Sequence, residues 1–219
     1  MTLVKPLYKS LVGKQEGLWR NCRDSIIHSL EHFDPGQEYQ PFHNSKWAIL
    51  SVAHAAEVYC NLLLSVFDPN HPKGDYPPLN KARGMLKGHP GLTESEKYVI
   101  GEVLTPLADQ RNTLMHMPAP EMLSATETAV ALLSLLHIIR RRMGLDTRKF
   151  LDESPAIERD IFEEIDWRKC AGWYRIAEKL VMWEYGEAYV EGCSNCGAFA
   201  VPPDMPCQAC FEPASRSRD

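Results

Sequence analysis

Apolar residues recur at steps of three and four along most of the chain, which is the spacing of one face of a helix. The clearest stripe consists of Ile49, Ala53, Ala56, Cys60, Leu63 and Phe67. The pattern predicts helices over residues 15–33, 45–67, 94–117, 126–143, 155–165 and 167–186. A further short helix is expected near residues 80–87, inside a connection over 68–92 that is rich in proline and glycine.

A few residues predict where these helices begin and end. The Asn-Ser pair at 44–45 can cap the second helix. Thr93 and Glu96 have the spacing of a capping box. Pro106 predicts either a kink or the start of a new helix, because proline lacks the N–H that a helix interior needs. Gly144 is a helix stop.

Only the segment from about residue 188 onward lacks helical periodicity. The fold class is therefore predicted to be all-α, a helical bundle with additional C-terminal helices and a small cysteine-rich module. We divide the chain into a helical domain at 1–145, a helical extension at 146–187, and the module with its tail at 188–219.

Composition, net charge and the length of the apolar runs argue against several classes of protein. The chain has 219 residues, of which 44% are hydrophobic and 24% charged, as in soluble globular proteins. Its formal net charge of -5 argues against a generally basic nucleic-acid binder, so any contact with RNA needs a local patch. No apolar run approaches the roughly 18 residues of a membrane helix, and the N-terminus lacks the apolar core of a secretory signal. We therefore expect a cytoplasmic protein without membrane contact.

Four of the seven cysteines form two CxxC pairs near the C-terminus, Cys193 with Cys196 and Cys207 with Cys210. Gly197 follows the first pair, at a position where a tight knuckle often needs a positive φ. Two such pairs can supply four thiolates to one tetrahedral Zn²⁺, and a site closed by four protein ligands is structural rather than catalytic. The spacing predicts a zinc ribbon, and the alternative is that these cysteines are unpaired or form disulfides.

The most informative segment for chemistry is QRNTLMHM at residues 110–117. In a helix, Asn112 and His116 lie one turn apart on the same face, with Arg111 beside them on an otherwise apolar stripe. A guanidinium there is unfavourable unless it is paired or lines an anion site. Arginine, asparagine and histidine together can hold a phosphate, donate hydrogen bonds and move a proton.

Two other arginine–histidine pairs have similar spacing, Arg23 with His28 and Arg83 with His89, and ordinary surface polarity is the simpler interpretation of both. The surrounding sequence distinguishes the third pair, Arg111 with His116. QRNTLMHM at the end of a helix resembles the signature of the HEPN superfamily, and the order of the surrounding segments is similar too. A helix like the family's second helix precedes it at residues 51–64, and an apolar helix follows it at 129–144. The resemblance covers roughly residues 15–145.

This resemblance implies a metal-independent endoribonuclease with an HEPN-like helical bundle, in which two protomers form one cleft. It assigns catalytic roles to Arg111, Asn112 and His116. The implied reaction is attack of an RNA 2'-OH on the adjacent phosphate, with Arg111 stabilising the transition state and His116 acting as general acid or base. The implied partners are RNA and a second copy of the chain, with an antitoxin or a defence-system protein as a further expectation. The setting would be phage defence or toxin activity.

Two other functions stay open at this point. One is a non-catalytic HEPN adaptor that binds RNA, a nucleotide or a protein partner. The other is a zinc-ribbon regulatory protein whose helical body only dimerises. No cofactor other than structural Zn²⁺ is expected.

Polar residues also lie off the main apolar stripe of the helix at 45–67, namely His54, Glu57 and Asn61, beside Trp47 and Leu50. They are expected to form either a solvated face or a contact surface for a dimer or for the active cleft.

A second set, Arg140 to Arg142 with Arg148 and Lys149, is the densest basic cluster. It is expected either to stabilise the C-terminus of its helix or to contact the RNA backbone. His137, on the same helix, is expected to be a packed core residue.

Overall fold

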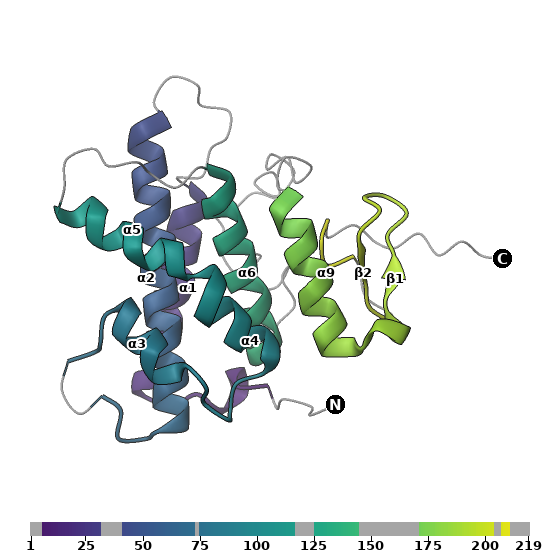
Figure 1. The fold of residues 1–219 in the computed structure, drawn as a ribbon. Helices are drawn as coiled ribbons and strands as arrows, with labels where there is room; N and C mark the ends of the chain where they lie inside the picture. Colours follow the sequence, from purple (N-terminus) through teal and green to yellow (C-terminus); the bar gives the residue numbers. More distant parts are fainter. Residues whose placement is uncertain are drawn as a thin grey trace. The chain divides into compact units, whose positions relative to one another are not determined.

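The computed structural model describes residues 6–31, 41–72, 75–116, 125–144, 171–203 and 207–210. The chain divides into two compact units, one formed by Val4–Ile165 and the other by Met1–Leu3 with Asp166–Asp219. The described residues are mostly helical, with two short strands, so the prediction of an all-α fold class is confirmed (Figure 1). The predicted helix at 155–165 and the predicted boundary between residues 145 and 146 lie outside the described residues.

The first unit is built around one long helix. Its elements are η1 (Tyr8–Ser10), α1 (Lys14–Glu31), α2 (Pro41–Phe67), α3 (Leu79–Leu86), α4 (Glu94–Tyr98), η2 (Val99–Val103), α5 (Thr105–His116) and α6 (Ala125–Met143). The central α2 contacts α1, α3, α5 and α6 (Figure 1). The predicted stripe is buried among these neighbours from Ile49 to Leu63, its last member Phe67 is half-buried, and His137 is buried as expected.

Helix α2 begins at Pro41, four residues before the predicted start. The pair at 44–45 therefore lies inside the helix rather than capping it. Proline is favoured at the first helical position because its missing N–H is one that a helix start leaves unpaired. An Asn-Ser pair signals a cap only by residue type, whereas Pro41 fixes the backbone angle that starts the helix.

The same helix is long and apolar enough over Lys46–Phe67 to cross a membrane by length and composition, with a hydropathy of 1.5. This differs from the expectation that no apolar run approaches that length, because the window tolerates interspersed polar residues. Since 78% of the window is buried inside the protein, α2 has the character of a core helix. A single segment of this kind is weak evidence for a membrane span.

Pro106 marks the start of a new helix, one of the two predicted outcomes. A π-helical turn, η2, comes just before it, and the N–H of Leu104 reaches the carbonyl of Val99 at 3.0 Å. Arg83 from α3 supports this turn, since its Nε donates to the carbonyl of Ile100 at 2.6 Å and its Nη2 to that of Gly101 at 3.0 Å. Arg83 thus stabilises the junction that sets the direction of α5.

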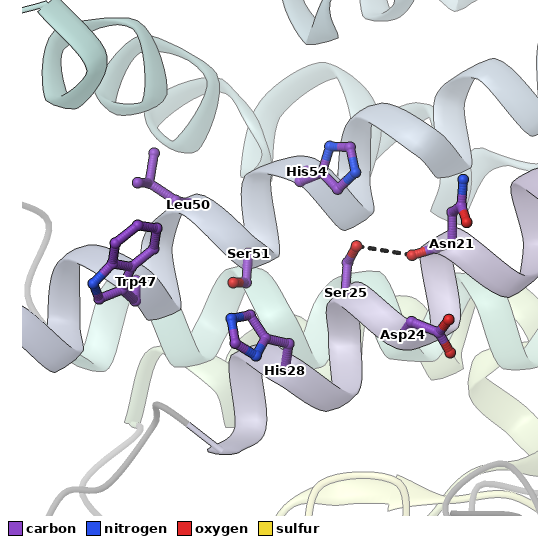
Figure 2. A pocket seen from close by; sticks show the side chains of 8 residues that line it. All are labelled: Asn21, Asp24, Ser25, His28, Trp47, Leu50, Ser51 and His54. Atoms are coloured by element: carbon purple, nitrogen blue, oxygen red, sulfur yellow. Dashed lines mark hydrogen bonds between the residues drawn. The ribbon is translucent and has the colours of Figure 1, made fainter.

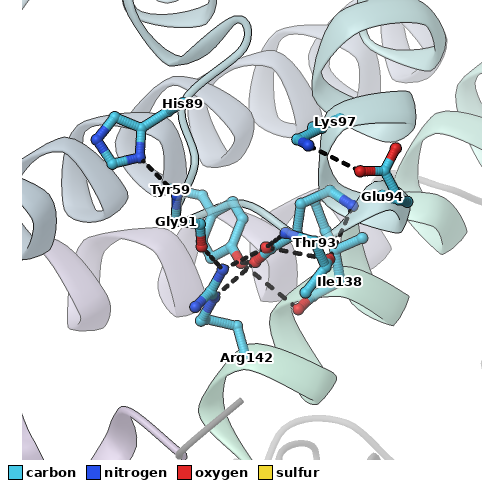
Figure 3. A network of polar contacts seen from close by, with 9 residues as sticks. Tyr59, His89, Gly91, Thr93, Glu94, Lys97, Ile138 and Arg142 are labelled. Atoms are coloured by element: carbon cyan, nitrogen blue, oxygen red, sulfur yellow. Dashed lines mark hydrogen bonds and ion pairs between the residues drawn. The ribbon is translucent and has the colours of Figure 1, made fainter. Parts of the chain in front are cut away.

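The capping box of Thr93 and Glu96 is confirmed, and Glu96 has a second role. Its carboxylate forms an ion pair with Arg142, whose Nε donates to Glu96 Oε1 at 2.7 Å (Figure 3). Arg142 Nη2 also donates to the carbonyl of Gly91 at 2.8 Å. The two side chains are only 7% and 3% exposed. Arg142 lies in the last turn of α6, as one of the two interpretations expects, but it is buried and paired, so the alternative of an RNA backbone contact is corrected for this residue.

Replacing Glu96 with alanine is expected to lower the free energy of unfolding by about 3 kcal/mol or more, because it leaves the Arg142 guanidinium buried without its carboxylate. Urea unfolding followed by circular dichroism measures this change. The control is Glu94→Ala. Glu94 is 70% exposed and pairs with Lys97 at 2.7 Å, so its loss should change stability by less than about 1 kcal/mol. Equal effects of the two substitutions would contradict a structural role for the buried pair.

The second unit joins a helix to the cysteine-rich module. Its elements are α9 (Ala171–Tyr185), η4 (Glu187–Tyr189), β1 (Glu191–Gly192) and β2 (Phe199–Val201), and the two strands pair antiparallel. Trp173 of α9 is fully buried, and its Nε1 donates to the carbonyl of Ala209 at 2.9 Å. The backbone N–H of Phe199 donates to Glu178 Oε1 at 2.9 Å. Helix α9 thus packs with the module in one unit.

Candidate functional site

The four cysteines of the two CxxC pairs come together in the second unit, and their sulfur atoms all lie within 4.8 Å of one another. The Sγ atoms of Cys193 and Cys210 are 3.7 Å apart, and those of Cys196 and Cys207 are 3.8 Å apart. All four are free cysteines, which excludes the disulfide alternative for them in this structure. The predicted set is therefore confirmed as a group that can hold a metal ion.

Local backbone geometry holds the sulfur atoms in place. Gly197 has a φ of +75°, as the knuckle position predicts, and its N–H donates to the carbonyl of Cys193 at 2.8 Å. The N–H of Ala209 donates to Cys207 Sγ at 3.4 Å. Burial opposes ionisation of Cys193, yet backbone hydrogen bonds to its sulfur from residues 195–196 leave the pKa of this thiol below its ordinary value. Burial raises the pKa of the Cys207 thiol, with the neighbouring cysteines acting in the same direction.

In the first unit, Arg111 lies on α5 and is paired with Glu57 of α2. Arg111 Nη1 is 3.2 Å from Glu57 Oε2, and Nη2 donates to Oε1 at 3.4 Å. Glu57 Oε2 also accepts the N–H of Leu79, at the start of α3, at 2.8 Å. The Arg111 side chain is 29% exposed and that of Glu57 16%. Arg111 is therefore both paired, as its place on an apolar stripe requires, and open to solvent on one side.

Asn112 and His116 belong to the same helix as Arg111. The helical backbone puts them one turn apart on one face, the spacing that the sequence predicts. Their side chains lie outside the described part of the structure, so their contacts with Arg111 stay a prediction.

The expected solvated face of α2 is only partly solvated. His54 is exposed, but Glu57 is partly buried, and Asn61 is only 1% exposed. Asn61 Nδ2 donates to the carbonyls of Glu57 and Pro77, both at 3.0 Å, and its Oδ1 lies 3.1 Å from His71 Nε2. Asn61 therefore anchors the connection that follows α2 and is not available for contact with a partner.

An open pocket with a volume of about 560 Å³ lies between α1 and α2 (Figure 2). It is lined by Asn21, Asp24, Ser25, His28, Trp47, Leu50, Ser51 and His54. His28 belongs to one of the two look-alike arginine–histidine pairs, and the structure places it here rather than on a featureless surface. The two residues of the other pair have different roles. Arg83 supports η2, whereas His89 stacks on Phe67 with ring centroids 4.2 Å apart.

The chain was compared with models of protein families, with curated proteins and with solved structures. None of them matches.

Sequence reasoning missed two features of the first unit. It did not pair Glu57 with Arg111, because the two residues are 54 positions apart and only the packing of α5 on α2 brings them together. It also missed the pocket, whose walls come from two different helices. The sequence did contain one signal for the pair. An unpaired guanidinium on an apolar stripe is unfavourable, so Arg111 needs a partner such as a carboxylate, but the sequence does not identify Glu57 as that carboxylate.

Proposed function

We propose that the chain is an endoribonuclease of the HEPN type, acting as a cytoplasmic homodimer, with Arg111, Asn112 and His116 as its catalytic residues. The observation that carries the proposal is the position of Arg111. A carboxylate holds its guanidinium at two nitrogens while part of the side chain faces solvent. An arginine fixed in this way can present its remaining N–H groups to a phosphate with little loss of conformational entropy.

In the proposed reaction, the 2'-OH of a nucleotide attacks the adjacent phosphorus. The P–O5' bond breaks, leaving a 2',3'-cyclic phosphate and a free 5'-OH. Arg111 stabilises the charge that develops on the phosphoryl oxygens. His116 transfers a proton to the leaving oxygen or takes one from the nucleophile. Asn112 positions the phosphate or the histidine, and Glu57 positions Arg111.

Incubation of the purified protein with single-stranded RNA in EDTA is expected to yield fragments that end in 2',3'-cyclic phosphate and begin with 5'-OH. Transesterification by arginine and histidine needs no metal ion, so the chelator should not slow the reaction. Electrophoresis of end-labelled RNA, with and without phosphatase treatment of the ends, measures the products. A reaction abolished by EDTA and restored by Mg²⁺ would contradict this chemistry.

One observation favours the alternative of a non-catalytic adaptor. The Glu57 carboxylate neutralises the Arg111 charge, so this part of the site attracts a phosphate less strongly than an unpaired arginine would. Under this alternative the same surface binds RNA, a nucleotide or a protein partner without turnover. Absence of cleavage by wild type on any RNA, together with retained binding, is its expected signature.

For the second unit the proposal is a structural zinc ribbon. In a tetrahedral site with Zn–S bonds of about 2.3 Å, neighbouring sulfur atoms are about 3.8 Å apart. The two sulfur pairs at 3.7 Å and 3.8 Å fit that geometry. Four thiolates favour Zn²⁺ over the hard cations, which prefer oxygen. A bound Zn²⁺ would cross-link the two CxxC knuckles. A regulatory or binding role of the ribbon would depend on the fold that this cross-link stabilises.

A further inference from the structure

The pocket between α1 and α2 combines one large aromatic ring with polar groups and carries no arginine or lysine among its eight lining side chains. Trp47 is 41% exposed, and Figure 2 shows it at one end of the groove, with His28 and His54 at its sides. Asn21, Asp24 and Ser25 form the rest of the α1 wall, where Ser25 Oγ donates to the backbone carbonyl of Asn21 at 2.8 Å (Figure 2). Beside the indole ring and the two imidazoles, the lining carries the carboxylate of Asp24, which lies 4.0 Å from Arg23 Nε.

The residues that line the pocket favour some classes of ligand over others. A phosphate or another anion would face Asp24 and find no arginine or lysine. A ligand here would have to contact both the exposed ring of Trp47 and the hydrogen-bonding side chains around it. A nucleobase fits both constraints, because its flat ring stacks on tryptophan and its edge exchanges hydrogen bonds with serine, asparagine and histidine. The volume of about 560 Å³ is in the range of small-ligand sites.

One wall of the pocket belongs to the helix that also carries Glu57, the partner of the proposed catalytic arginine. His54 lines it, and Glu57 follows three residues later on α2, so the two side chains are neighbours on the helix surface. Glu57 in turn holds Arg111. Trp47 lies ten residues before Glu57 on α2, a rise of about 15 Å, so an RNA strand whose phosphate lies against Arg111 would reach Trp47 with a base a few nucleotides away.

We propose that this pocket binds a base of single-stranded RNA a few nucleotides from the scissile phosphate, with Trp47 as its stacking platform. The proposal rests on the proposed function for the position of the phosphate, while the pocket itself is defined independently by its lining. Trp47 is a binding residue here and takes no part in proton transfer.

The test measures binding by fluorescence anisotropy with the full chain. The probe is a fluorescein-labelled single strand of about 12 nucleotides, 2'-O-methylated so that it cannot be cleaved. Trp47→Ala is expected to weaken binding about five- to hundredfold, the range for loss of one base stack, and Trp47→Phe to recover most of the loss. Trp183→Ala is the matched control, because Trp183 is 45% exposed but lies in the other unit. A second probe, abasic throughout, should bind wild type and Trp47→Ala equally.

Each outcome decides the proposal. Equal binding of the 2'-O-methylated probe by wild type and Trp47→Ala overturns it, as does an equal loss in Trp183→Ala. Conversion of a dimer to a monomer by Trp47→Ala in light scattering also overturns it, because the groove would then be covered by a second copy of the chain. If wild type cleaves RNA and Trp47→Ala does not change the rate, the base-binding role of the pocket is overturned while the proposed nuclease function stands. Base-dependent binding through Trp47 without cleavage supports the pocket and removes the nuclease.

Discussion

Replacing Arg111 with alanine is expected to slow RNA cleavage about 100- to 1000-fold, the usual loss when one preorganised charge donor is removed from a transition state. His116→Ala is expected to cost about 100- to 10000-fold, because it removes the proton transfer. Asn112→Ala should have a smaller effect if the amide only positions its neighbours. Single-turnover rates on a labelled RNA strand measure all three, and thermal unfolding shows whether the variants stay folded.

Arg20→Ala is the matched control for the arginine. Arg20 is an exposed arginine on α1, so its loss changes the net charge by the same amount without touching α5. Cleavage by Arg20→Ala should stay near the wild-type rate. Glu57→Gln keeps the size of the side chain but removes the charge that holds Arg111, and a partial loss of rate is expected. Equal losses from Arg20→Ala and Arg111→Ala would show that general charge, not the Arg111 site, determines activity.

The features that could be predicted from the sequence are those that depend on near neighbours in the chain. The capping box at Thr93 needs only the residue three positions later, and it is present. Gly144 and Gly197 have positive φ values, as a helix stop and a knuckle require. The grouping of the four cysteines also follows from spacing, because each CxxC turn brings its own two sulfur atoms together and a short loop joins the turns.

The features that escaped prediction depend on contacts between distant segments. Arg142 follows two other arginines at the end of α6, so the local pattern indicates a solvated cluster. Its burial against Glu96 results from the packing of α4 on the same end of α6, across 46 positions of sequence. Likewise Asn61 looks like one more polar residue on an exposed face, and it is buried because the connection after α2 folds back over it. Periodicity gives the faces of a helix but not their partners.

Replacing Cys193 with serine is expected to abolish metal binding and unfold the second unit, including the contacts of α9. Wild type should contain one equivalent of Zn²⁺ per chain by elemental analysis. Apparent binding free energies of about 10–16 kcal/mol for structural zinc exceed what so small a module gains from packing, so its folding depends on the ion. The buried Trp173 reports the change, because its ring packs in this unit and its Nε1 donates to the carbonyl of Ala209, next to Cys210 of the four-cysteine group. A red shift of tryptophan emission and loss of amide protection in residues 171–185 are the expected signals.

Cys22→Ala separates this effect from the mere loss of a thiol. Cys22 is a fully buried free cysteine of α1, in the other unit. Its replacement should leave the zinc content at one equivalent. In Cys193→Ser, amides of α2 should keep their protection, because the two units have separate cores. Because thiolate ligands compete with protons, the second unit alone should also unfold as pH falls and zinc is released. A wild-type zinc content far below one equivalent after gentle purification, or a Cys193→Ser protein with Trp173 still buried, would show that side-chain packing rather than a metal ion holds the four cysteines together.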